Sequence, residues 1–254
     1  MKLPTKDILS LFDNYSRVAR LYPALLAIAP IVWTIGLFHP ELVIGDKSKA
    51  IVSAVVFFGG LTLLANVARS RGKAIEPQLI AAWGGWRSTI ILRHRNDTID
   101  SYTKKRYHDQ LKKLCPELEL PNVEEEAQNQ VDSDAKYRSA TKRLIELRRD
   151  EKYKLLHKEN ALYGFRRNLL GLKPLAITIA LGMTCVSVLA CWLGATLPFN
   201  TYNMVLADIA SRWPIYALVL LNLGYMTFWI SIVRYHFVQQ AADEYAVALF
   251  RTLE

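Results

Sequence analysis

Aromatic and cationic side chains are interleaved in one part of this chain, residues 83–113, and together they could bind a polyanion. Aromatic faces stack on nucleobases, and guanidinium and ammonium groups neutralise phosphates, which are the contacts that a nucleotide or a single-stranded oligonucleotide requires. Basic residues at 148, 149 and 152, expected on a later helix, could complete the pocket. The ligand-binding residues predicted on this basis are Trp83, Trp86, Arg87, Arg93, Arg95, Tyr102, Lys104, Lys105, Arg106, Tyr107, Arg148 and Arg149.

The basic residues admit a second interpretation, in which anionic lipid is the partner. Cationic side chains close to the cytoplasmic leaflet are attracted to lipid headgroups by about 1 kcal/mol each. This interpretation explains the basic residues at 69, 71, 73, 166, 167 and 173, but it explains the concentration between 83 and 113 less well. Trp83 and Trp86 could equally anchor a core.

Other kinds of chemistry find no support in the sequence. It contains no phosphate-binding loop, dinucleotide fingerprint, nucleophile elbow or zinc-protease motif. His94, His108 and His157 have no partners at metal-ligand spacing, and the acidic run 124–126 is expected to be a solvated face. The three cysteines form no C-x-x-C pair. We therefore expect no catalysis, no metal and no cofactor.

The residues that could bind a ligand belong to a polar segment between two apolar regions. Segment 69–173 carries 23 Lys and Arg against 15 Asp and Glu, so it holds +8 of the chain's net charge of +9. Each apolar region contains two uncharged runs long enough to cross a bilayer. The sequence therefore predicts an all-α membrane protein with four spans, in which a mainly helical domain, 69–173, is inserted between transmembrane hairpins 21–68 and 174–234. Amphipathic helices are expected at both ends, over 1–20 and 235–254.

The distribution of Lys and Arg around the spans predicts the orientation in the membrane. The two short hairpin turns carry three basic residues, Lys47, Lys49 and Arg212. The flanks on the opposite side carry many more, and the positive-inside rule therefore places both termini and the central domain in the cytoplasm. These flanking residues are Arg17, Arg20, Arg69, Arg71, Lys73, Arg166, Arg167, Lys173 and Arg234.

The predicted spans contain mildly polar residues but no charged ones. Without Asp, Glu, Lys, Arg or His they offer no proton relay and no partner for an ionic substrate, which disfavours a transporter. Several copies around an axis could instead line a pore. A non-conducting anchor, whose polar groups bond between helices, is the alternative. The predicted pore-lining residues are Thr34, Thr62, Asn66, Asn222 and Tyr225.

Within the central domain, capping and breaking residues predict a series of helices. Gly84 and Gly85 should break the first helix, whose start is expected at Pro77, and residues 88–95 fit either a strand or a short helix. Asp100 should cap a helix that runs to about 113, and the acidic segment 124–134 should be a loop. A long helix should follow, with a possible break near 150 or 164, and should lead towards a span that begins at Pro174.

Several segments of the insert resemble a known group of bacterial proteins. They are Trp-Gly-Gly at 83–85, Leu-Arg-His-Arg at 92–95 with Asp97, the run 103–108, Glu-Asn at 159–160 and the run 163–169. These segments, which cover about half of the chain with their junctions, resemble the four-span transmembrane effectors of Hailong antiphage systems. The alternative resemblance is to four-span effectors of related defence systems that are gated by cyclic nucleotides.

The resemblance implies a homo-oligomeric ion channel, for example a tetramer, in the bacterial inner membrane. It also implies that an oligodeoxyadenylate made by a partner nucleotidyltransferase holds the channel shut, and that loss of the ligand during infection depolarises the cell. We expect the junction before the third span to transmit the ligand state to the membrane through Tyr163, Arg166, Arg167 and Asn168. A non-conducting scaffold that binds a cytosolic partner or anionic lipid is the competing hypothesis.

Overall fold

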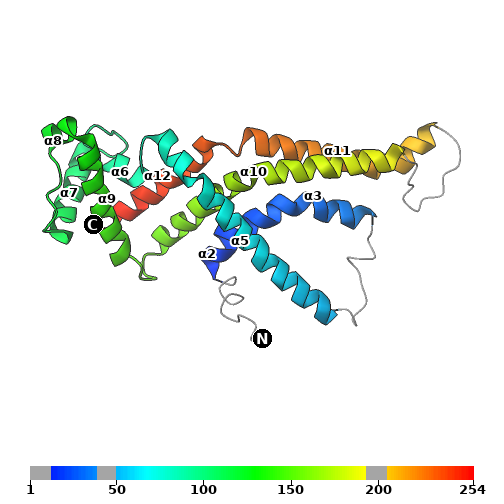
Figure 1. Ribbon diagram of the computed structural model, residues 1–254, viewed down its shortest axis with the longest axis horizontal. Coiled ribbons are helices and arrows are strands. Elements are labelled where there is room, and N and C mark those ends of the chain that lie inside the picture. The colour runs from blue at the N-terminus through cyan, green and yellow to red at the C-terminus, as the bar shows by residue number, and fades with distance from the viewer. Residues whose placement is uncertain (1–12, 39–49, 193–204) are drawn as a thin grey trace. The chain divides into compact units, whose positions relative to one another are not determined.

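The computed structural model describes residues 13–38, 50–192 and 205–254, and all regular elements in these ranges are helices (Figure 1). The all-α prediction is confirmed to that extent. The predicted N-terminal helix and the two hairpin turns lie largely outside the described residues. The helices are α2 (Asn14–Ser16), the π-helical turn η1 (Arg17–Leu21), α3 (Tyr22–Phe38), α5 (Ala50–Trp83), α6 (Arg87–Leu92), α7 (Ser101–Leu114), α8 (Val123–Gln128), α9 (Gln130–Leu147), α10 (Lys154–Trp192), α11 (Val205–Ser231) and α12 (Tyr235–Arg251).

Contacts divide the chain into two compact units. The first, here called the apolar unit, consists of Met1–Lys73 and Asn168–Arg234. The second, here called the polar unit, consists of Ala74–Arg167 and Tyr235–Glu254. The tail helix α12, which the sequence analysis treated as a separate element, is therefore part of the same unit as the insert.

Within the described residues, three helical stretches are long and apolar enough to cross a membrane. They are Asn14–Phe38, Lys154–Leu189 and Arg212–Ser231, whose most apolar 18-residue windows have mean hydropathies of 1.9, 1.8 and 1.4. Between 28% and 33% of their most apolar windows is buried inside the protein, so most of this surface is left to contact lipid. The chain is therefore a membrane protein. The predicted second span, 50–68, lies in α5, whose side chains before Gly59 are outside the described set.

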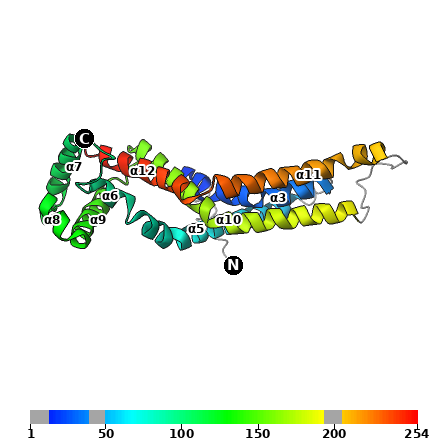
Figure 2. The same cartoon turned by 90° about the horizontal axis from the view of Figure 1, so that it is seen from above.

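In the apolar unit, α3 and α11 lie side by side (Figure 2). Lys173 of α10 donates hydrogen bonds from Nζ to the carbonyls of Ile230 and Val233, at 3.3 and 2.8 Å. Carbonyls at the end of a helix have no partner within it, so this lysine both caps α11 and ties it to α10.

Two helices are longer than the sequence indicated. Pro77 and Pro174 lie inside α5 and α10, so the prediction that each begins a helix was wrong. An interior proline removes one backbone hydrogen bond and kinks the helix, but the residues on both sides keep the remaining bonds. The predicted break near 150 is confirmed, because α9 ends at Leu147 and α10 begins at Lys154.

The segment 124–134, predicted to be a loop, is helical instead. It forms α8 and the start of α9 because side chains cap both helices. Asn122 accepts a hydrogen bond from the Glu125 N–H at 2.8 Å, and the Glu125 carboxylate accepts one from the Asn122 N–H at 3.0 Å. Asn129 caps α9 in the same way, through the Asp132 N–H. Acidic residues in a first turn also favour the helix dipole.

The remaining elements of the polar unit follow the predicted signals more closely. Gly84 and Gly85, with φ of 75° and 139°, end α5 as expected, because such backbone angles suit glycine. The ambiguous stretch after them is the short helix α6. Asp100 caps α7 by accepting a hydrogen bond from the Thr103 N–H at 2.9 Å, and the bonds from Thr103 lower the pKa of this carboxyl.

Helix α12 is amphipathic, as predicted, and its apolar side completes the core of the polar unit. Leu249 and Phe250 are fully buried, and the ring of Phe250 lies 6.1 Å from that of Tyr107. Figure 2 shows α12 beside α6. The apolar side chains buried together in this core are Ile91, Leu92, Tyr107, Leu111, Leu120, Tyr137, Leu144, Leu156, Leu249 and Phe250.

Candidate anion-binding site

A hollow of about 510 Å³ lies in the polar unit between the start of α6 and one face of α9. The α9 residues that line it recur every three or four positions, so they form a single stripe along the helix. The lining residues are Gly85, Trp86 and Thr89 on one side, and Val131, Asp134, Ala135, Arg138, Ser139 and Lys142 on the other.

The lining of the hollow combines an aromatic ring with two cations. The Arg138 guanidinium lies over the Trp86 ring, 5.3 Å from its centroid, which orients both side chains. Lys142 follows one turn later on α9. The Thr89 hydroxyl is buried and has no hydrogen-bond partner among the described residues. A buried hydroxyl without a partner is costly, but this oxygen has almost no accessible surface, so the groups that the hollow offers to a ligand are the ring and the two cations.

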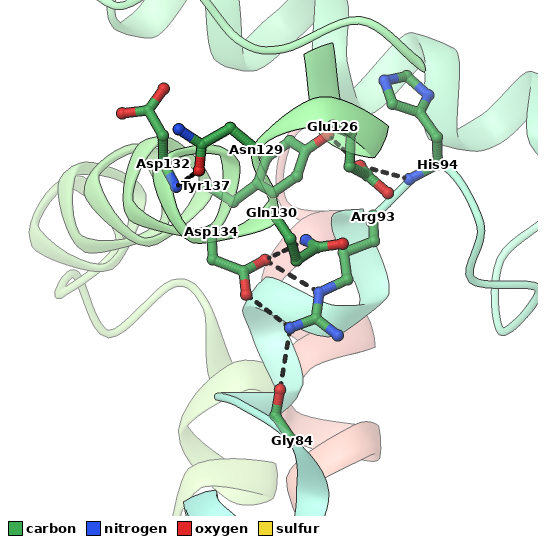
Figure 3. A network of polar contacts seen from close by, with 9 residues as sticks. All are labelled: Gly84, Arg93, His94, Glu126, Asn129, Gln130, Asp132, Asp134 and Tyr137. Atoms are coloured by element: carbon green, nitrogen blue, oxygen red, sulfur yellow. Dashed lines mark hydrogen bonds and ion pairs between the residues drawn. The ribbon is translucent and has the colours of Figure 1, made fainter. Parts of the chain in front are cut away.

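Asp134 does not cancel this positive charge, because Arg93 already neutralises it. The Arg93 guanidinium donates from Nε and Nη2 to the two carboxylate oxygens of Asp134, at 2.9 and 2.6 Å, and from Nη2 to the Gly84 carbonyl at 2.9 Å (Figure 3). Gln130 donates a further hydrogen bond to Asp134 at 2.8 Å. Arg138 and Lys142 therefore leave the hollow with a net positive charge suited to an anion.

Of the residues predicted to bind the ligand, Trp86 lines the hollow, while several others hold the fold together. Arg87 forms a bidentate ion pair with Asp243 of α12, at 2.5 and 3.1 Å. Lys104 is buried and donates from Nζ to the carbonyls of Arg93, His94 and Asn96; burial lowers its pKa. Tyr107 is buried in the core. Arg93 is also buried, and it is held in its ion pair with Asp134.

The other predicted residues lie outside the hollow. Arg95, Tyr102, Lys105 and Arg149 are exposed, and Arg106 pairs with Glu254 at 3.0 Å. Trp83 is half-buried, and its indole N–H is buried without a partner among the described residues.

The later arginines stand in a different place from the one expected. The sequence analysis put residues 148, 149 and 152 on a helix, but they lie in the break between α9 and α10. Arg148 donates hydrogen bonds to the hydroxyl and the carbonyl of Thr252, both at 3.2 Å, and its guanidinium lies 5.2 Å from the centroid of the Tyr153 ring. It therefore attaches this break to the end of the tail helix.

Sequence reasoning missed Arg138, Ser139 and Lys142. Their spacing from Val131 and Asp134 marks one helical stripe, and that pattern was the available signal. The signal was lost because 124–134 was interpreted as a loop, which cut the stripe in two.

The polar unit also contains a buried carboxylate, that of Glu126. Glu126 is 4% exposed and accepts hydrogen bonds from the His94 N–H at 2.9 Å and the Tyr137 hydroxyl at 2.8 Å (Figure 3). Burial and the neighbouring carboxylate raise the pKa of Tyr137. The prediction that residues 124–126 form a solvated face was thus wrong for Glu126, which joins α8 and α9 to the loop after α6.

His108 lies beside this network in the core of the polar unit. Its Nε2 is 2.9 Å from the Leu92 carbonyl, and its ring centroid is 4.8 Å from that of His94. Burial lowers the pKa of His108 to about 4, because a charged imidazole would lose its water without gaining a carboxylate. The bond to Leu92 opposes this shift, and the nearby His94, Lys104 and Lys112 add to it.

We expect acid to destabilise the polar unit through His108. Above pH 6.5, the ordinary pKa of the group, both folded and unfolded chains hold a neutral imidazole. Between pH 6.5 and about 4 the unfolded chain takes up the proton first, so stability falls by up to about 1.4 kcal/mol per pH unit. Thermal melting from pH 8 to 4 would measure this loss. His108→Gln should melt with a weaker pH dependence than the parent, and equal slopes would contradict the prediction.

Most of the residues predicted to transmit a signal towards the membrane join helices within the polar unit. Glu76 of α5 accepts hydrogen bonds from Arg167 at 2.8 Å and from the Tyr163 hydroxyl at 3.3 Å. Arg166 donates to the Phe237 carbonyl at 3.0 Å, and its guanidinium lies 4.5 Å from the centroid of that ring. These residues therefore connect α10 to α5 and α12.

The residues predicted to line a pore are largely engaged within the single chain. Thr34 is buried and donates to the carbonyl of Pro30 in its own helix at 2.6 Å. Asn222 is buried and accepts a hydrogen bond from the Trp33 indole at 2.9 Å. Tyr225 donates to a carbonyl of α3. On α5, Thr62 is half-buried and Asn66 is exposed.

The helices and the hollow together define a helical membrane protein with a polar unit that carries a cationic site. Among the described residues, no group of three or more His, Cys, Asp and Glu is placed to hold a metal ion. Comparisons with models of protein families, with curated proteins and with solved structures find no match for the chain.

Proposed function

We propose that this protein is a pore-forming effector of bacterial antiphage defence. It assembles as a homo-oligomeric ion channel of the inner membrane, with α3, α5, α10 and α11 as its four spans and with the polar unit and both termini in the cytoplasm. The polar unit binds a nucleotide or a short single-stranded oligonucleotide, made by a partner nucleotidyltransferase, that holds the channel closed. Loss of the ligand during infection depolarises the membrane. The protein itself catalyses no reaction.

The observation that carries this proposal is the cationic hollow of the polar unit. It places an aromatic ring and two cations around one space, and these are the groups that bind a base and a phosphate. Helices α5 and α10 each begin in one unit and end in the other, so the ligand-binding unit and the spans share continuous helices. The resemblance to four-span defence effectors also supports the proposal of a ligand-gated channel.

One observation favours a second function, that of a non-conducting scaffold. Thr34, Asn222 and Tyr225 form their hydrogen bonds inside one chain, as the polar groups of a packed anchor do. In that case the polar unit would bind a cytosolic partner or anionic lipid without opening a pore.

The double variant Arg138→Gln, Lys142→Gln should lose affinity for a labelled oligodeoxyadenylate. Removing two phosphate contacts should also reduce the slope of log K against log salt by about 2. Fluorescence anisotropy of the purified full-length protein in detergent, at several salt concentrations, would measure both effects. The melting temperature should stay close to that of the parent, because neither side chain forms an ion pair with any of the described residues.

The matched control is Arg95→Gln, Lys105→Gln, which removes the same charge from exposed positions outside the hollow. It should change affinity much less. If both double variants weaken binding equally, the oligonucleotide is held by diffuse surface charge, and the hollow is not its site.

Conduction is tested separately from binding. Cells that express the protein without the partner nucleotidyltransferase should lose their membrane potential, as read by a voltage-sensitive dye, and co-expression of that enzyme should restore it. A scaffold would leave the potential unchanged under both conditions, and that result would overturn the channel proposal.

A further inference from the structure

Pro30 lies inside α3 and removes a hydrogen-bond donor from its backbone. In an α-helix the N–H of each residue bonds the carbonyl four positions earlier, and proline has no N–H. Pro30 therefore takes away the N–H that would bond the carbonyl of Leu26. Ala19 lies in the π-helical turn η1 before α3, where the backbone does not follow this pattern. An unsatisfied carbonyl costs several kcal/mol in hydrocarbon, so another donor is needed.

Side chains from two other helices supply those donors. Tyr225 of α11 donates from its hydroxyl to the Leu26 carbonyl at 2.6 Å. Asn168 of α10 donates from Nδ2 to the Ala19 carbonyl, also at 2.6 Å, and both residues are fully buried there. The Leu26 carbonyl, exposed by Pro30, and the Ala19 carbonyl of η1 are thus the acceptors through which this helix is fastened to its neighbours.

The rest of the α3 contact combines one aromatic residue with small side chains. Trp33 donates from its indole to Asn222 at 2.9 Å, and its ring centroid lies 5.4 Å from that of Tyr225. The buried positions of α3 include Pro23, Ala24, Ala27 and Pro30, while Val32 and Ile35 are exposed. Because small side chains contribute limited packing energy, the interhelical hydrogen bonds contribute a large share of the attachment.

Spare donors lie along α11 beside this attachment. The Asn222 amide Nδ2 and the Trp229 indole N–H are both buried and have no hydrogen-bond partner among the described residues. They lie on the same face as Tyr225, whose ring is 5.8 Å from that of Trp229. A displaced α3 would meet further donors, as a helix with two alternative positions requires.

We propose that α3 is the moving helix of the apolar unit, and that Asn168 and Tyr225 hold it in the closed arrangement through the carbonyls of Ala19 and Leu26, the second of which Pro30 exposes. This inference rests on the proposed channel function. Asn168 lies on α10, the helix that also contributes to the polar unit, so a change in α10 acts first on the Ala19 attachment. Release of α3 then opens the path for ions.

A mutant cycle between Pro30 and Tyr225 tests the inference. Tyr225→Phe should raise ion leakage from vesicles that contain the protein and its oligodeoxyadenylate ligand by about fivefold, because one interhelical hydrogen bond is lost. Pro30→Ala restores the N–H that bonds Leu26 within the helix. In the Pro30→Ala background, Tyr225→Phe should therefore change leakage little. An equal effect in both backgrounds would overturn the role of the exposed carbonyl.

A second measurement keeps the inference testable if the channel proposal fails. Spin labels at Val32 of α3 and Leu220 of α11, both well exposed, report the separation of these helices without reference to conduction. In a background whose cysteines are replaced, Tyr225→Phe should broaden or shift the distance distribution, and in the Pro30→Ala background Tyr225→Phe should change it little. An unchanged distribution in Tyr225→Phe would show that α3 does not move. Absence of leakage in every protein, with the predicted distance changes, would reject the channel alone.

Discussion

Gly171→Ala is expected to force α5 and α10 apart and to destabilise the apolar unit severely. A Cβ atom at this position would lie 2.5 Å from the carbonyl carbon of Arg71, 2.6 Å from its oxygen and 2.6 Å from the Gly72 nitrogen. All three are backbone atoms of a helix, which cannot rotate away as a side chain can. Overpacking of this kind costs about 1–3 kcal/mol or more, which corresponds to a fall in melting temperature of about 2–12 °C.

Size-exclusion chromatography and thermal melting in detergent would measure this effect. Gly182→Ala is the matched control, because it lies on the same helix and no described atom lies within 4 Å of its Cβ position. Alanine should there be neutral or slightly stabilising, by up to about 1 kcal/mol from helix propensity. If the two alanine variants melt alike, the helices do not cross at Gly171.

The importance of Gly171 illustrates what the sequence could and could not predict in the apolar unit. Apolar runs are a property of single segments, so the spans could be located from composition. The place where α5 and α10 cross depends instead on which residues of the two helices contact each other. A small residue alone does not mark the crossing, since no described atom lies within 4 Å of a Cβ at Gly59 of α5. The close contact is instead near Gly72, where an added Cβ would meet Asn168.

The same limit explains why most of the residues predicted to bind the ligand do not line the hollow. Trp86 was predicted because an aromatic residue among cations is a local signal. Whether an arginine is free to bind a ligand depends on acids that lie far away in the sequence. Arg87 pairs with Asp243, 156 residues later, and Arg93 pairs with Asp134, 41 residues later. No local sequence pattern predicts such distant partners. Charge alone therefore could not distinguish the arginines that form ion pairs within the polar unit from those that face the hollow.

Arg93→Ala is the second variant for which a large effect is expected, and it separates these two roles. The Arg93 side chain is 10% exposed and that of Asp134 is 27% exposed, so the ion pair is largely withdrawn from water. Its loss would leave the Asp134 carboxylate with Gln130 as its remaining described side-chain partner and would free the Gly84 carbonyl that ends α5. Breaking a pair of this kind should cost roughly 2–4 kcal/mol.

The melting temperature of the full-length protein in detergent should therefore fall by several degrees in Arg93→Ala, and oligodeoxyadenylate binding should weaken only as the unit unfolds. Arg138→Ala provides the contrast: it should weaken binding while the melting temperature stays near that of the parent, because Arg138 stacks on Trp86 and pairs with no carboxylate in the described residues. If Arg93→Ala melts normally and loses the oligonucleotide, Arg93 contacts the ligand directly, as the sequence alone predicted, and the ion pair with Asp134 must open when the ligand binds.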